Sequence, residues 1–440
     1  MVIASIDLQD GKAVQLKQGK DLVLARDNPV ELAEEFDRYG EVAVIDLDAA
    51  MNKGNNLHLI KPILRKAECR VGGGIRTADQ AKELVSLGAR KIIIGSAAFR
   101  DPAKKQSGGF GINIPLLKEI AEKIGKQRLI VAIDARETNG KYEITVDGWK
   151  TQTGLELLET AKALERYAGE LLFTCVEREG EMNGINFEPV RELRQAVSCL
   201  VTVAGGVSTL EEIEDISALG CDIQLGMALY TGKISLADAF IHSLDWEKDK
   251  HATGDLLPFT CYLLPLIVQS PDGQILMTGH ADKEALEETF KRGNVCFHSR
   301  SRGKLWMKGE KSGNILKLLK MRCDCDSDAL LAIAEPAGPV CHTGEWSCFA
   351  TNRKYTWEFL HSIISERFRN PVPGSYTATL DDKLVREKII EEAEELCTAK
   401  NKEEIIWEAA DLLYFATVLM TRAGVSVNEV LDELDRRHKK

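Results

Sequence analysis

The segment "CDCDSD", residues 323–328, places three aspartates and two cysteines within six positions. In an extended strand, alternate side chains point to opposite faces, so Cys325 would face away from the three aspartates. Carboxylate oxygens are the ligands that Mg²⁺ prefers, whereas a thiolate suits Zn²⁺. We therefore predict that this segment is a strand that holds two unlike cations, with Mg²⁺ bound by Asp324, Asp326 and Asp328.

Two further cysteines, Cys341 and Cys348, follow in the segment "PVCHTGEWSCF". With Cys325 they give three thiolates, which leave the fourth position of a tetrahedral zinc ion open for water, as in catalytic zinc sites. Such an ion lowers the pKa of its water toward neutrality. The alternative is that Cys323 and Cys325 are small buried residues and that the aspartates form a solvated turn. For Cys323 alone, a packing role is the preferred interpretation.

A second group of acids lies near the end of the sequence, where apolar residues recur with helical period. Glu392 with Glu395, and Glu408 with Asp411, are each three residues apart, and such residues share one face of a helix. Two antiparallel helices can therefore bring four carboxylates together, which suits Mg²⁺ and the cleavage of a phosphoanhydride by water. Acids at this spacing are also typical of solvated helix faces. The apolar residues around Glu408 and Asp411 favour buried metal ligands.

Two aspartates in the first half of the chain occupy equivalent positions of an internal repeat. Asp7 lies in "SIDL" and Asp134 in "AIDA", 127 residues apart, and two other pairs of segments repeat at offsets of 132 and 131 residues. Short apolar strands alternate with amphipathic helical segments over residues 1–240, and eight such units close into a (β/α)8 barrel. Both aspartates then face the same mouth and can act as base and acid. The alternative is that one aspartate only caps a loop.

Glycines follow four of the expected strands in the same repeat. At the carboxyl ends of barrel strands, bare backbone N–H groups at helix N-termini can bind phosphate. One such group in each half of the barrel predicts a ligand with a phosphate at each end. The expected phosphate-binding residues are Gly73, Gly74, Gly95, Ser96, Gly205, Gly206 and Gly226.

A chain of 440 residues is too long for one typical domain, and its length predicts two or three domains to position these sites. We predict a multi-domain protein with a TIM barrel over residues 1–243, a mixed, mainly β metal-binding domain over 256–366, and an all-α domain over 380–440. A polar segment, 245–255, and a segment with two prolines and a glycine, 368–382, separate the domains.

The composition restricts the classes of function. A net charge of −11 argues against a nucleic-acid-binding protein, which needs a basic face for phosphates. No apolar run approaches about 18 residues, and the first residues contain no basic segment of a signal peptide, so we expect neither a membrane span nor secretion. An odd number of cysteines, eleven, without such a signal indicates reduced thiols and a cytoplasmic location.

The central motifs resemble those of phosphoribosyl-AMP cyclohydrolase of histidine biosynthesis. The resemblance rests on "CFHSRSRGKLWMKGEKSGN" (296–314), "DCDSDALL" and "CHTGEWSCF". It implies hydrolytic opening of an adenine ring, with Mg²⁺ on the three aspartates and Zn²⁺ on Cys325, Cys341 and Cys348. It also implies a homodimer that shares the zinc site, the ligand at position 325 coming from Cys325 of the partner subunit.

Other polar residues of the central segment are candidates for contact with the substrate. His342, next to a zinc cysteine, is either a proton shuttle or only a hydrogen-bond partner near the metal. The cations Arg300, Arg302 and Lys308, with Lys304 between them, either bind the nucleotide phosphate or are solvated surface residues. No role is assigned to His298.

Residues 384–438 resemble phosphoribosyl-ATP pyrophosphatase, an all-α relative of the house-cleaning nucleotide pyrophosphatases. The metal-binding E-x-x-E and E-x-x-D of that family match the four acids Glu392, Glu395, Glu408 and Asp411. The product of that family is phosphoribosyl-AMP, which is the substrate of the cyclohydrolase. The presence of both resemblances on one chain therefore supports each of them.

Residues 1–240 resemble the phosphoribosylformimino-5-aminoimidazole carboxamide ribotide isomerase, through "SIDLQDGKAVQLKQG", "VGGGIRT" and "GGVSTLEEI". The resemblance implies an Amadori rearrangement, an aldose-to-ketose shift, of the aminoaldose that the cyclohydrolase makes. The catalytic aspartates of that family match Asp7, which we expect to be the base, and Asp134, which we expect to be the acid.

The barrel departs from that family in one motif, where the usual T-D-I-x-x-D-G-T reads "TCVEREGE". Thr174 is kept as a candidate catalytic residue, Cys175 and Glu179 replace aspartates, and Glu181 replaces a threonine. Glu179 keeps a carboxylate one methylene further out and remains a catalytic candidate. Gln15 stands where the family usually has arginine. A barrel that serves only as a scaffold or binding module is therefore an open alternative.

We therefore predict a multifunctional, ATP-derivative-binding enzyme of histidine biosynthesis that binds Zn²⁺ and Mg²⁺ and acts on small phosphoribosyl nucleotides. It would remove pyrophosphate from phosphoribosyl-ATP, open the adenine ring, and isomerise the product. The first alternative is a bifunctional cyclohydrolase and pyrophosphatase with a non-catalytic barrel. The second, from another class, is a nucleotide-sensing regulator that binds the metals without turnover.

Overall fold

The structure is a computed structural model of the chain. It describes residues 1–17, 21–107, 109–138, 140–180, 182, 184–246, 262–349, 355–371 and 374–438. These residues form two compact units, of which the first comprises Met1–Gln269 with Met277–Val340 and the second Ser270–Leu276 with Cys341–Lys440. The predicted domain start at residue 256 and the end of the predicted linker 245–255 lie outside the described residues.

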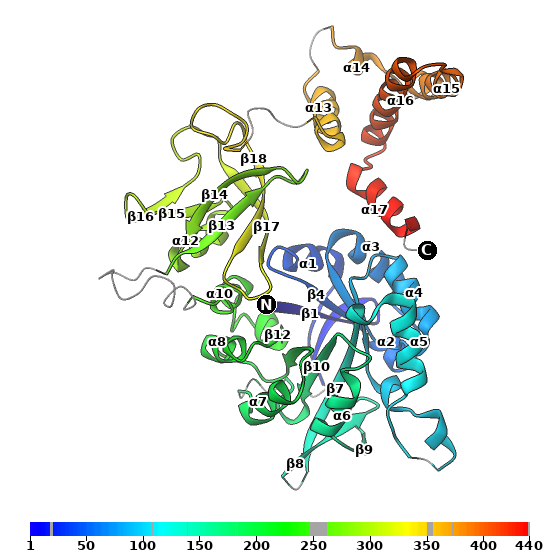
Figure 1. The fold of residues 1–440 in the computed structure, drawn as a ribbon, viewed down its shortest axis with the longest axis vertical. Helices are drawn as coiled ribbons and strands as arrows, with labels where there is room; N and C mark the ends of the chain where they lie inside the picture. Colours follow the sequence, from blue (N-terminus) through cyan, green and yellow to red (C-terminus); the bar gives the residue numbers. More distant parts are fainter. Residues whose placement is uncertain are drawn as a thin grey trace. The chain divides into compact units, whose positions relative to one another are not determined.

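Within the described part of the first unit, eight parallel strands close into a barrel (Figure 1). Each strand is hydrogen-bonded to a neighbour on both sides, in the order β1, β4, β5, β6, β7, β10, β11, β12 and back to β1. The TIM barrel predicted from the internal repeat is thus confirmed. The strands are β1 (Val2–Gln9), β4 (Val42–Asp46), β5 (Cys69–Gly72), β6 (Lys91–Ile94), β7 (Leu129–Thr138), β10 (Glu170–Cys175), β11 (Leu200–Ala204) and β12 (Asp222–Leu225).

The repeat is visible in the structure as two antiparallel hairpins. β2 (Lys12–Lys17) and β3 (Asp21–Arg26) follow β1 and pair with it through β2. β8 (Lys141–Val146) and β9 (Thr151–Glu156) follow β7 in the same way. Since β1 and β7 carry the two expected catalytic aspartates, each aspartate precedes a hairpin at the same end of the barrel.

Helices cover the outside of the barrel and bury apolar residues against the strands (Figure 1). The equivalent helices α4 and α8 begin with the same capping box, in which Thr77 pairs with Gln80 and Thr209 with Glu212. The helices of this part are α1 (Pro29–Phe36), α2 (Leu47–Ala50), α3 (Leu57–Lys66), α4 (Ala78–Ser86), α5 (Ile114–Ile124), α6 (Leu157–Leu164), α7 (Phe187–Ala196), α8 (Leu210–Ala218), α9 (Met227–Tyr230) and α10 (Leu236–His242), with 3₁₀ turns η1 (Ser96–Phe99), η2 (Pro102–Ser107), η3 (Lys126–Arg128) and η4 (Val176–Arg178).

Charged side chains fill the barrel at the end where the strands begin. Arg70 is fully buried and pairs with Glu41 and with Glu170, whose carboxylate lies 2.5 Å from Arg70 Nη1 and 2.6 Å from Lys91 Nζ. Burial alone would raise the pKa of Glu170, but the cations Arg70 and Lys91 lower it. Thr202 also donates a hydrogen bond to this carboxylate at 2.5 Å. At this end of the barrel the buried charged side chains therefore form a network in which each charge has a partner of opposite sign.

The central part of the chain is mainly β, as predicted. Four strands form a sheet in the order β14–β13–β18–β17, in which β13 and β18 are parallel and β17 and β18 antiparallel. β15 and β16 form a separate antiparallel pair. The elements are β13 (Leu264–Gln269), β14 (Ile275–Ala281), α12 (Lys283–Arg292), β15 (Cys296–Ser299), β16 (Lys304–Met307), β17 (Leu316–Cys323) and β18 (Leu330–Pro336).

The last part of the chain is helical, as predicted, although its helices begin earlier than expected. Leu360 and Ile364 of α13 share one buried core with Val385, Phe415 and Val418, so α13 packs with the C-terminal helices. The predicted boundary at residue 366 therefore falls inside a helix. The helices are α13 (Trp357–Arg369), α14 (Tyr376–Thr379), α15 (Asp382–Thr398), α16 (Lys402–Arg422) and α17 (Val427–His438).

Among the described residues, no single helix has the length and apolar character needed to cross a membrane. One bent pair, Lys402–Arg422 with Val427–Asp435, passes on length and composition only, with an angle of 113° between its helices.

Candidate functional site

Three carboxyl groups converge where the barrel strands end. Asp7 lies in β1, Asp134 in β7, and Glu179 directly after η4. The charges of both aspartates act on the pKa of Glu179. Glu179 Oε2 lies only 2.7 Å from the position that a Cβ atom would take at residue 205. Gly205, with φ of +87°, therefore makes room for this carboxylate. The structure thus brings together three of the catalytic candidates.

The protein environment raises the pKa of these carboxyl groups. Burial raises the pKa of Asp7 to about 6, although the hydroxyl of Ser5, 3.2 Å away, acts in the opposite direction. Burial, and then repulsion from Asp7 and Asp134, raises the pKa of Glu179 to about 7. Groups that titrate near neutral pH can both accept and donate protons there, so the cluster is suited to acid–base chemistry.

Asp134 has two polar neighbours, one of which was predicted. Burial raises the pKa of Asp134, and hydrogen bonds from Trp149 and Thr174 oppose the increase. Thr174 is buried and stands opposite Asp134 in the pairing of β10 with β7. Trp149 was missed, because "DGWK" has no periodic pattern that distinguishes it from an ordinary turn. Its φ of +66° is uncommon for a bulky residue, which indicates that the surrounding structure holds it in place.

The expected phosphate-binding residues all lie directly after barrel strands. Those after β5 and β6 are neighbours, and so are those after β11 and β12, because the two strands of each pair are hydrogen-bonded. The two groups belong to opposite halves of the repeat, as a ligand with two phosphates would require. Gly73 and Gly74 follow β5, Gly95 and Ser96 follow β6, Gly205 and Gly206 follow β11, and Gly226 follows β12.

Gln15 is a further polar residue at one of these turns. Its side chain is 4% exposed, and its Oε1 lies 2.9 Å from the position of a Cβ atom at Gly226. Among the described residues its Nε2 lacks a well-formed hydrogen bond, although the side chain acts on the Tyr230 hydroxyl. A buried amide next to a glycine turn can donate to a phosphate oxygen. The sequence showed Gln15 only as a departure from the family, and its position at the turn was not predicted.

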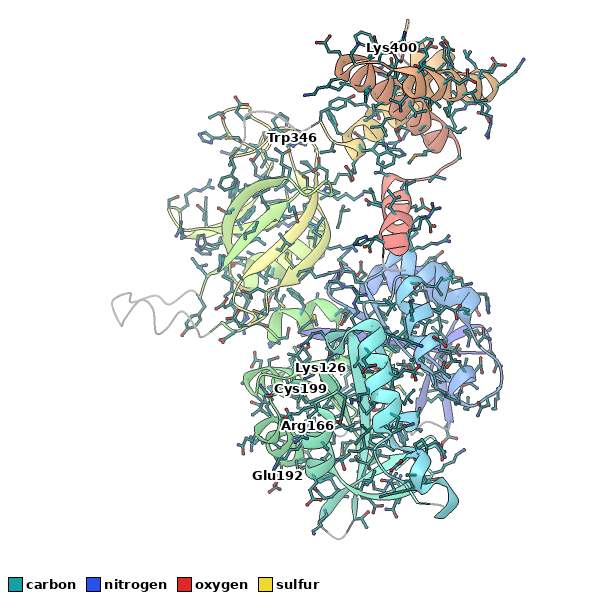
Figure 2. The ribbon with its side chains drawn as sticks, turned by 45° about the vertical axis from the view of Figure 1, so that its right-hand side comes forward. Lys126, Arg166, Glu192, Cys199, Trp346 and Lys400 are labelled. Atoms are coloured by element: carbon teal, nitrogen blue, oxygen red, sulfur yellow. The ribbon has the colours of Figure 1, made fainter. Side chains whose placement is uncertain are left out.

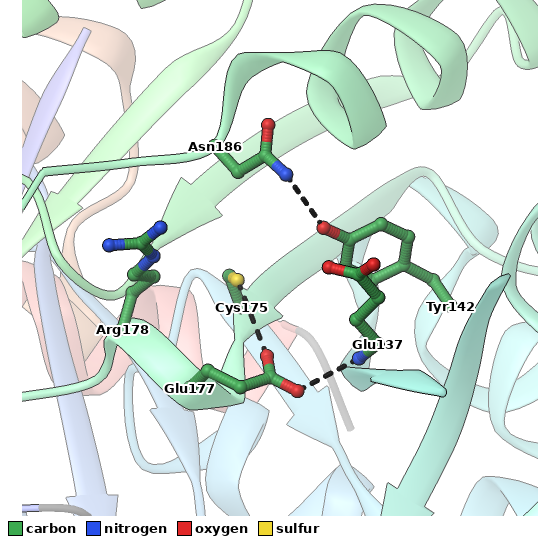
Figure 3. Close-up of a pocket in the computed structure, with 6 residues that line it drawn as sticks. All are labelled: Glu137, Tyr142, Cys175, Glu177, Arg178 and Asn186. Atoms are coloured by element: carbon green, nitrogen blue, oxygen red, sulfur yellow. Dashed lines mark hydrogen bonds between the residues drawn. The ribbon is translucent and has the colours of Figure 1, made fainter. Parts of the chain in front are cut away.

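A polar pocket of about 260 Å³ lies at the carboxyl ends of β7 and β10 (Figure 3). Its walls are fixed by hydrogen bonds, including one of 2.9 Å from Asn186 to the hydroxyl of Tyr142. Cys175 follows Thr174 in a strand, so the two side chains point to opposite faces. None of the three carboxyl groups is among the residues that line this pocket. It is lined by Glu137, Tyr142, Cys175, Glu177, Arg178 and Asn186.

The aspartates of the central motif come together, but the prediction of a strand was wrong. β17 ends at Cys323, and residues 324–328 form a turn in which Ser327 has a φ of +62°. The carboxylate of Asp324 accepts hydrogen bonds from the backbone N–H groups of Asp328 and Ala329, each at 3.1 Å, and so stabilises the turn. Oxygens of Asp324, Asp326 and Asp328 nevertheless all lie within 4.8 Å of one another.

Two of the expected zinc ligands, Cys341 and Cys348, lie close to each other in the second unit. Hydrogen bonds from Thr343, whose hydroxyl is 3.1 Å from Cys341 Sγ, lower the pKa of this thiol, and Cys348 contributes in the same direction. His342 is exposed, with its Nδ1 3.8 Å from the same sulfur. The third expected ligand, Cys325, lies on the aspartate turn of the first unit, 3.8 Å from a carboxylate oxygen of Asp326.

Two of the three expected substrate-binding cations lie close to one aromatic ring. Arg302 and Lys308 lie 5.3 and 5.8 Å from the centre of the Trp306 ring, and Arg300 is exposed. Lys308 is buried, unlike a solvated surface lysine. Nearby, His298 Nδ1 lies 2.6 Å from Asp282 Oδ2, so this histidine is fixed by a carboxylate in the manner of a proton-transfer residue.

A second acid cluster lies between α15 and α16, as predicted. Oxygens of Glu392, Glu395 and Glu408 lie within 4.8 Å of one another, and the charge of Asp411 acts on Glu392 and Glu408. Burial, followed by repulsion from the neighbouring acids, raises the pKa of both Glu392 and Glu408. A divalent cation would remove this repulsion, so the donor set fits Mg²⁺.

The surroundings of this cluster differ from the prediction in one respect. Glu392 is buried, but the apolar residues next to Glu408 are exposed, Trp407 by 70%. A pocket of about 190 Å³ lies beside the acids, lined by Glu395, Thr398, Ala399, Glu404 and Glu408. Lys400 follows in the connection between α15 and α16, where Figure 2 labels it.

Three family models match consecutive parts of the chain. The model described as "Histidine biosynthesis protein" matches residues 1–235, "Phosphoribosyl-AMP cyclohydrolase" matches 277–350, and "Phosphoribosyl-ATP pyrophosphohydrolase" matches 358–438. Each acid cluster described above therefore lies in a separate family region.

Curated proteins match the two halves of the chain over nearly their whole length. The 1-(5-phosphoribosyl)-5-((5-phosphoribosylamino)methylideneamino) imidazole-4-carboxamide isomerase of Methanosphaera stadtmanae is 34% identical over 247 residues, which are 54% of this chain and 98% of that protein. The histidine biosynthesis bifunctional protein HisIE of Pyrococcus furiosus is 40% identical over 218 residues, 46% of this chain and 99% of that protein. HisIE of Campylobacter jejuni is 42% identical over 188 residues, 40% of this chain and 91% of that protein.

The first family model covers more than half of the chain, and it covers the barrel that holds the three carboxyl groups. The other two models cover the central and helical parts in the order in which the structure presents them. The chain therefore belongs to the histidine biosynthesis protein family, with an isomerase-type barrel followed by a phosphoribosyl-AMP cyclohydrolase region and a phosphoribosyl-ATP pyrophosphohydrolase region.

Proposed function

We propose that this one chain catalyses three successive reactions of histidine biosynthesis, in the order from its C-terminal to its N-terminal part. The helical part releases pyrophosphate from phosphoribosyl-ATP, the central part opens the adenine ring of phosphoribosyl-AMP, and the barrel isomerises the aminoaldose product. The observation that carries the proposal is the coincidence of each matched family region with its own acid cluster.

In the barrel, we assign Asp7 as the base and Asp134 as the acid of an aldose-to-ketose rearrangement. Asp7, with a pKa of about 6, is largely ionised at neutral pH and can accept a proton from the sugar carbon. Asp134 has a raised pKa, which favours its protonated form for opening the ribose ring. Glu179 keeps the carboxyl group of the family motif within reach of both aspartates, and this supports a catalytic barrel over a scaffold alone.

In the central part, the residues present fit both expected metals. The pKa of Cys341 is lowered, which favours the thiolate that zinc needs, and Cys348 lies beside it. Zinc on Cys341 and Cys348, with Cys325 of the partner subunit as the third ligand, would supply an activated water at neutral pH, and Mg²⁺ fits the cluster of Asp324, Asp326 and Asp328. We assign His342 as the residue that moves a proton beside the cysteines, and Arg300, Arg302 and Lys308 as the cations that bind the nucleotide.

In the helical part, Glu392, Glu395, Glu408 and Asp411 would hold the Mg²⁺ that neutralises the polyphosphate during attack by water. The adjoining pocket, with Glu404 on its wall, is where phosphates linked through the metal would fit. The role of the chain is to hold the four acids at close distance, against their mutual repulsion, so that the site is ready for the cation.

A homodimer that shares the zinc site is part of the proposal. Ile390 of α15 and the consecutive residues Ile405, Ile406 and Trp407 of α16 are between 49% and 70% exposed. Large apolar residues in this number on adjacent helices are typical of a surface that another subunit covers. We also propose a cytoplasmic location, because the ten described cysteines are all free thiols.

The test is to supply the purified protein with phosphoribosyl-ATP and follow the products by mass and absorbance, with metal analysis of the same sample. We expect pyrophosphate, then the ring-opened aminoaldose, then the ketose. If the reaction stops at the aminoaldose, the barrel is a scaffold and the two hydrolase assignments stand. If zinc and magnesium bind but no product forms, the proposed function is wrong and the regulator is the better explanation.

A further inference from the structure

Asp37 follows α1 of the barrel and is 1% exposed, yet the cations that neutralise it come from β17 of the same unit. Lys320 Nζ pairs with Asp37 Oδ2, and Arg322 Nη2 lies 2.9 Å from Asp37 Oδ1. The backbone N–H of Glu68, in the barrel, donates to the same Oδ1 at 3.0 Å. Both carboxylate oxygens are thus used, and loss of this buried charge would take from Lys320 its carboxylate partner and leave Arg322 with the more distant Glu68, 3.9 Å away.

Backbone hydrogen bonds extend this contact to the aspartate turn. The N–H of Met321 donates to the carbonyl oxygen of Arg38 at 2.8 Å. The N–H of Asp245 donates to the carbonyl oxygen of Ser327, inside the turn, at 2.9 Å. Two residues that precede the central sheet in the sequence therefore hold the aspartate segment. Arg38 binds it before Asp324, and Asp245 binds it next to Asp328.

An aromatic contact supports the same arrangement. Phe290 of α12 lies between Tyr39 and Phe240 of the barrel, with ring centres 5.0 and 5.7 Å apart. Pairs of aromatic rings at these distances contribute beyond their buried area. The link between barrel and central sheet is thus a packed interface and does not rest on a single ion pair.

The aspartate turn has a physical need for such support. Its three carboxylates lie within 4.8 Å of one another and repel, and Ser327 has a positive φ. The hydrogen bonds to Asp324 join residues of the turn to one another, so the contacts with the barrel add support that these bonds do not give.

We infer that the barrel is a structural part of the cyclohydrolase centre, and that Asp37 is a positioning residue that holds β17 and the turn of Asp324, Asp326 and Asp328 in the arrangement that receives Mg²⁺. The inference rests on the proposed cyclohydrolase function for its catalytic consequence. Its structural content, that Asp37 orders the turn, is independent of that function.

The experiment compares Asp37→Asn and Asp37→Glu with the unchanged full-length protein. The matched control is Glu335→Gln, which removes a carboxylate 4.0 Å from Lys317 on the exposed face of the same sheet. Hydrogen exchange of peptides covering residues 316–330 is measured without metal. The Mg²⁺ concentration for half-maximal ring opening is then measured with phosphoribosyl-AMP as substrate, and unchanged hydrogen exchange of peptides from β1 and β7 reports that the barrel has folded.

For Asp37→Asn we expect exchange at least about tenfold faster in this segment and a Mg²⁺ requirement at least about tenfold higher. Asp37→Glu, which keeps the charge, should recover most of both, and Glu335→Gln should change neither. Unchanged exchange in Asp37→Asn overturns the inference, as does equal exchange in Asp37→Asn and Glu335→Gln. If the unchanged protein opens no ring, the proposed function fails, and the exchange measurement alone then decides the inference.

Discussion

Replacing Glu179 with glutamine tests the three-carboxyl cluster directly, because it removes one acid and keeps the size of the side chain. The pKa of Glu179 is raised from 4.5 to about 7 in the folded barrel by burial and by the two aspartates. Below pH 4.5 the carboxyl group is protonated in both the folded and the unfolded chain, so it has no effect on stability. As the pH rises from 4.5 to about 7, only the unfolded chain loses the proton, and folding becomes less favourable.

The size of this effect follows from the same values. Each pH unit in this interval costs about 1.4 kcal/mol, so the carboxyl group destabilises the folded barrel by about 3 kcal/mol above pH 7. At pH 5 the cost is below about 1 kcal/mol. We therefore expect Glu179→Gln to raise the unfolding temperature of the barrel at pH 8 by up to roughly 6–12 °C, and to change it little at pH 5.

The assay is scanning calorimetry of the unchanged protein and the variant at pH 5 and pH 8. Glu192→Gln is the control, because it makes the same change at an exposed position of the barrel, labelled in Figure 2. For the control we expect the unfolding temperature to differ from that of the unchanged protein by the same small amount at both pH values. If Glu179→Gln and Glu192→Gln respond alike, or if Glu179→Gln lowers stability at pH 8, the reasoning about the cluster is refuted. A gain in stability together with slower isomerisation would mark Glu179 as a residue kept for function.

Three other changes separate the proposed reactions. Asp7→Asn should slow the isomerisation by at least about a hundredfold while both hydrolytic steps continue, so the aminoaldose should accumulate in a mass-spectrometric assay. Formation of ketose at the normal rate would exclude Asp7 as the base. Cys348→Ser should reduce zinc affinity by at least about tenfold in a metal titration and slow ring opening, while pyrophosphate release stays unchanged. Retention of full zinc content would contradict the ligand assignment. Glu408→Gln should reduce Mg²⁺-dependent pyrophosphate release by at least about tenfold, while the adenine ring of supplied phosphoribosyl-AMP is still opened. Equal loss of both activities would point to misfolding instead of a metal site.

The barrel and its acids could be predicted from the sequence because their signals are repeated. The pairs of segments around Asp7 and Asp134 recur at nearly constant spacing, and the structure places both in equivalent strands. The helical acids could be predicted for a similar reason, since helical period alone puts Glu392 and Glu395 on one face. The internal repeat puts the two aspartates in equivalent strands, and the helical period puts the two glutamates on one face of a helix.

The aspartate turn shows where such reasoning fails. Alternating residues suggested a strand, but a side chain that binds the backbone of the following residues competes with strand pairing, and Asp324 does so. Trp149 and Gln15 could not be predicted, because their positions depend on contacts made by loops and by residues distant in sequence. The neutralisation of Asp37 by β17 is another contact between distant residues, and nothing local in the sequence predicts it.

The buried network of Arg70, Glu41 and Glu170 has a consequence for how molecules reach the barrel acids. Because these buried side chains occupy the end where the strands begin, the proposed substrate would reach the barrel acids from the loops at the opposite end. In the proposed reaction the aldose would enter, and the ketose would leave, by this same route. The ketose should therefore act as a competitive inhibitor of its own formation, and the rate of its departure sets an upper limit on turnover.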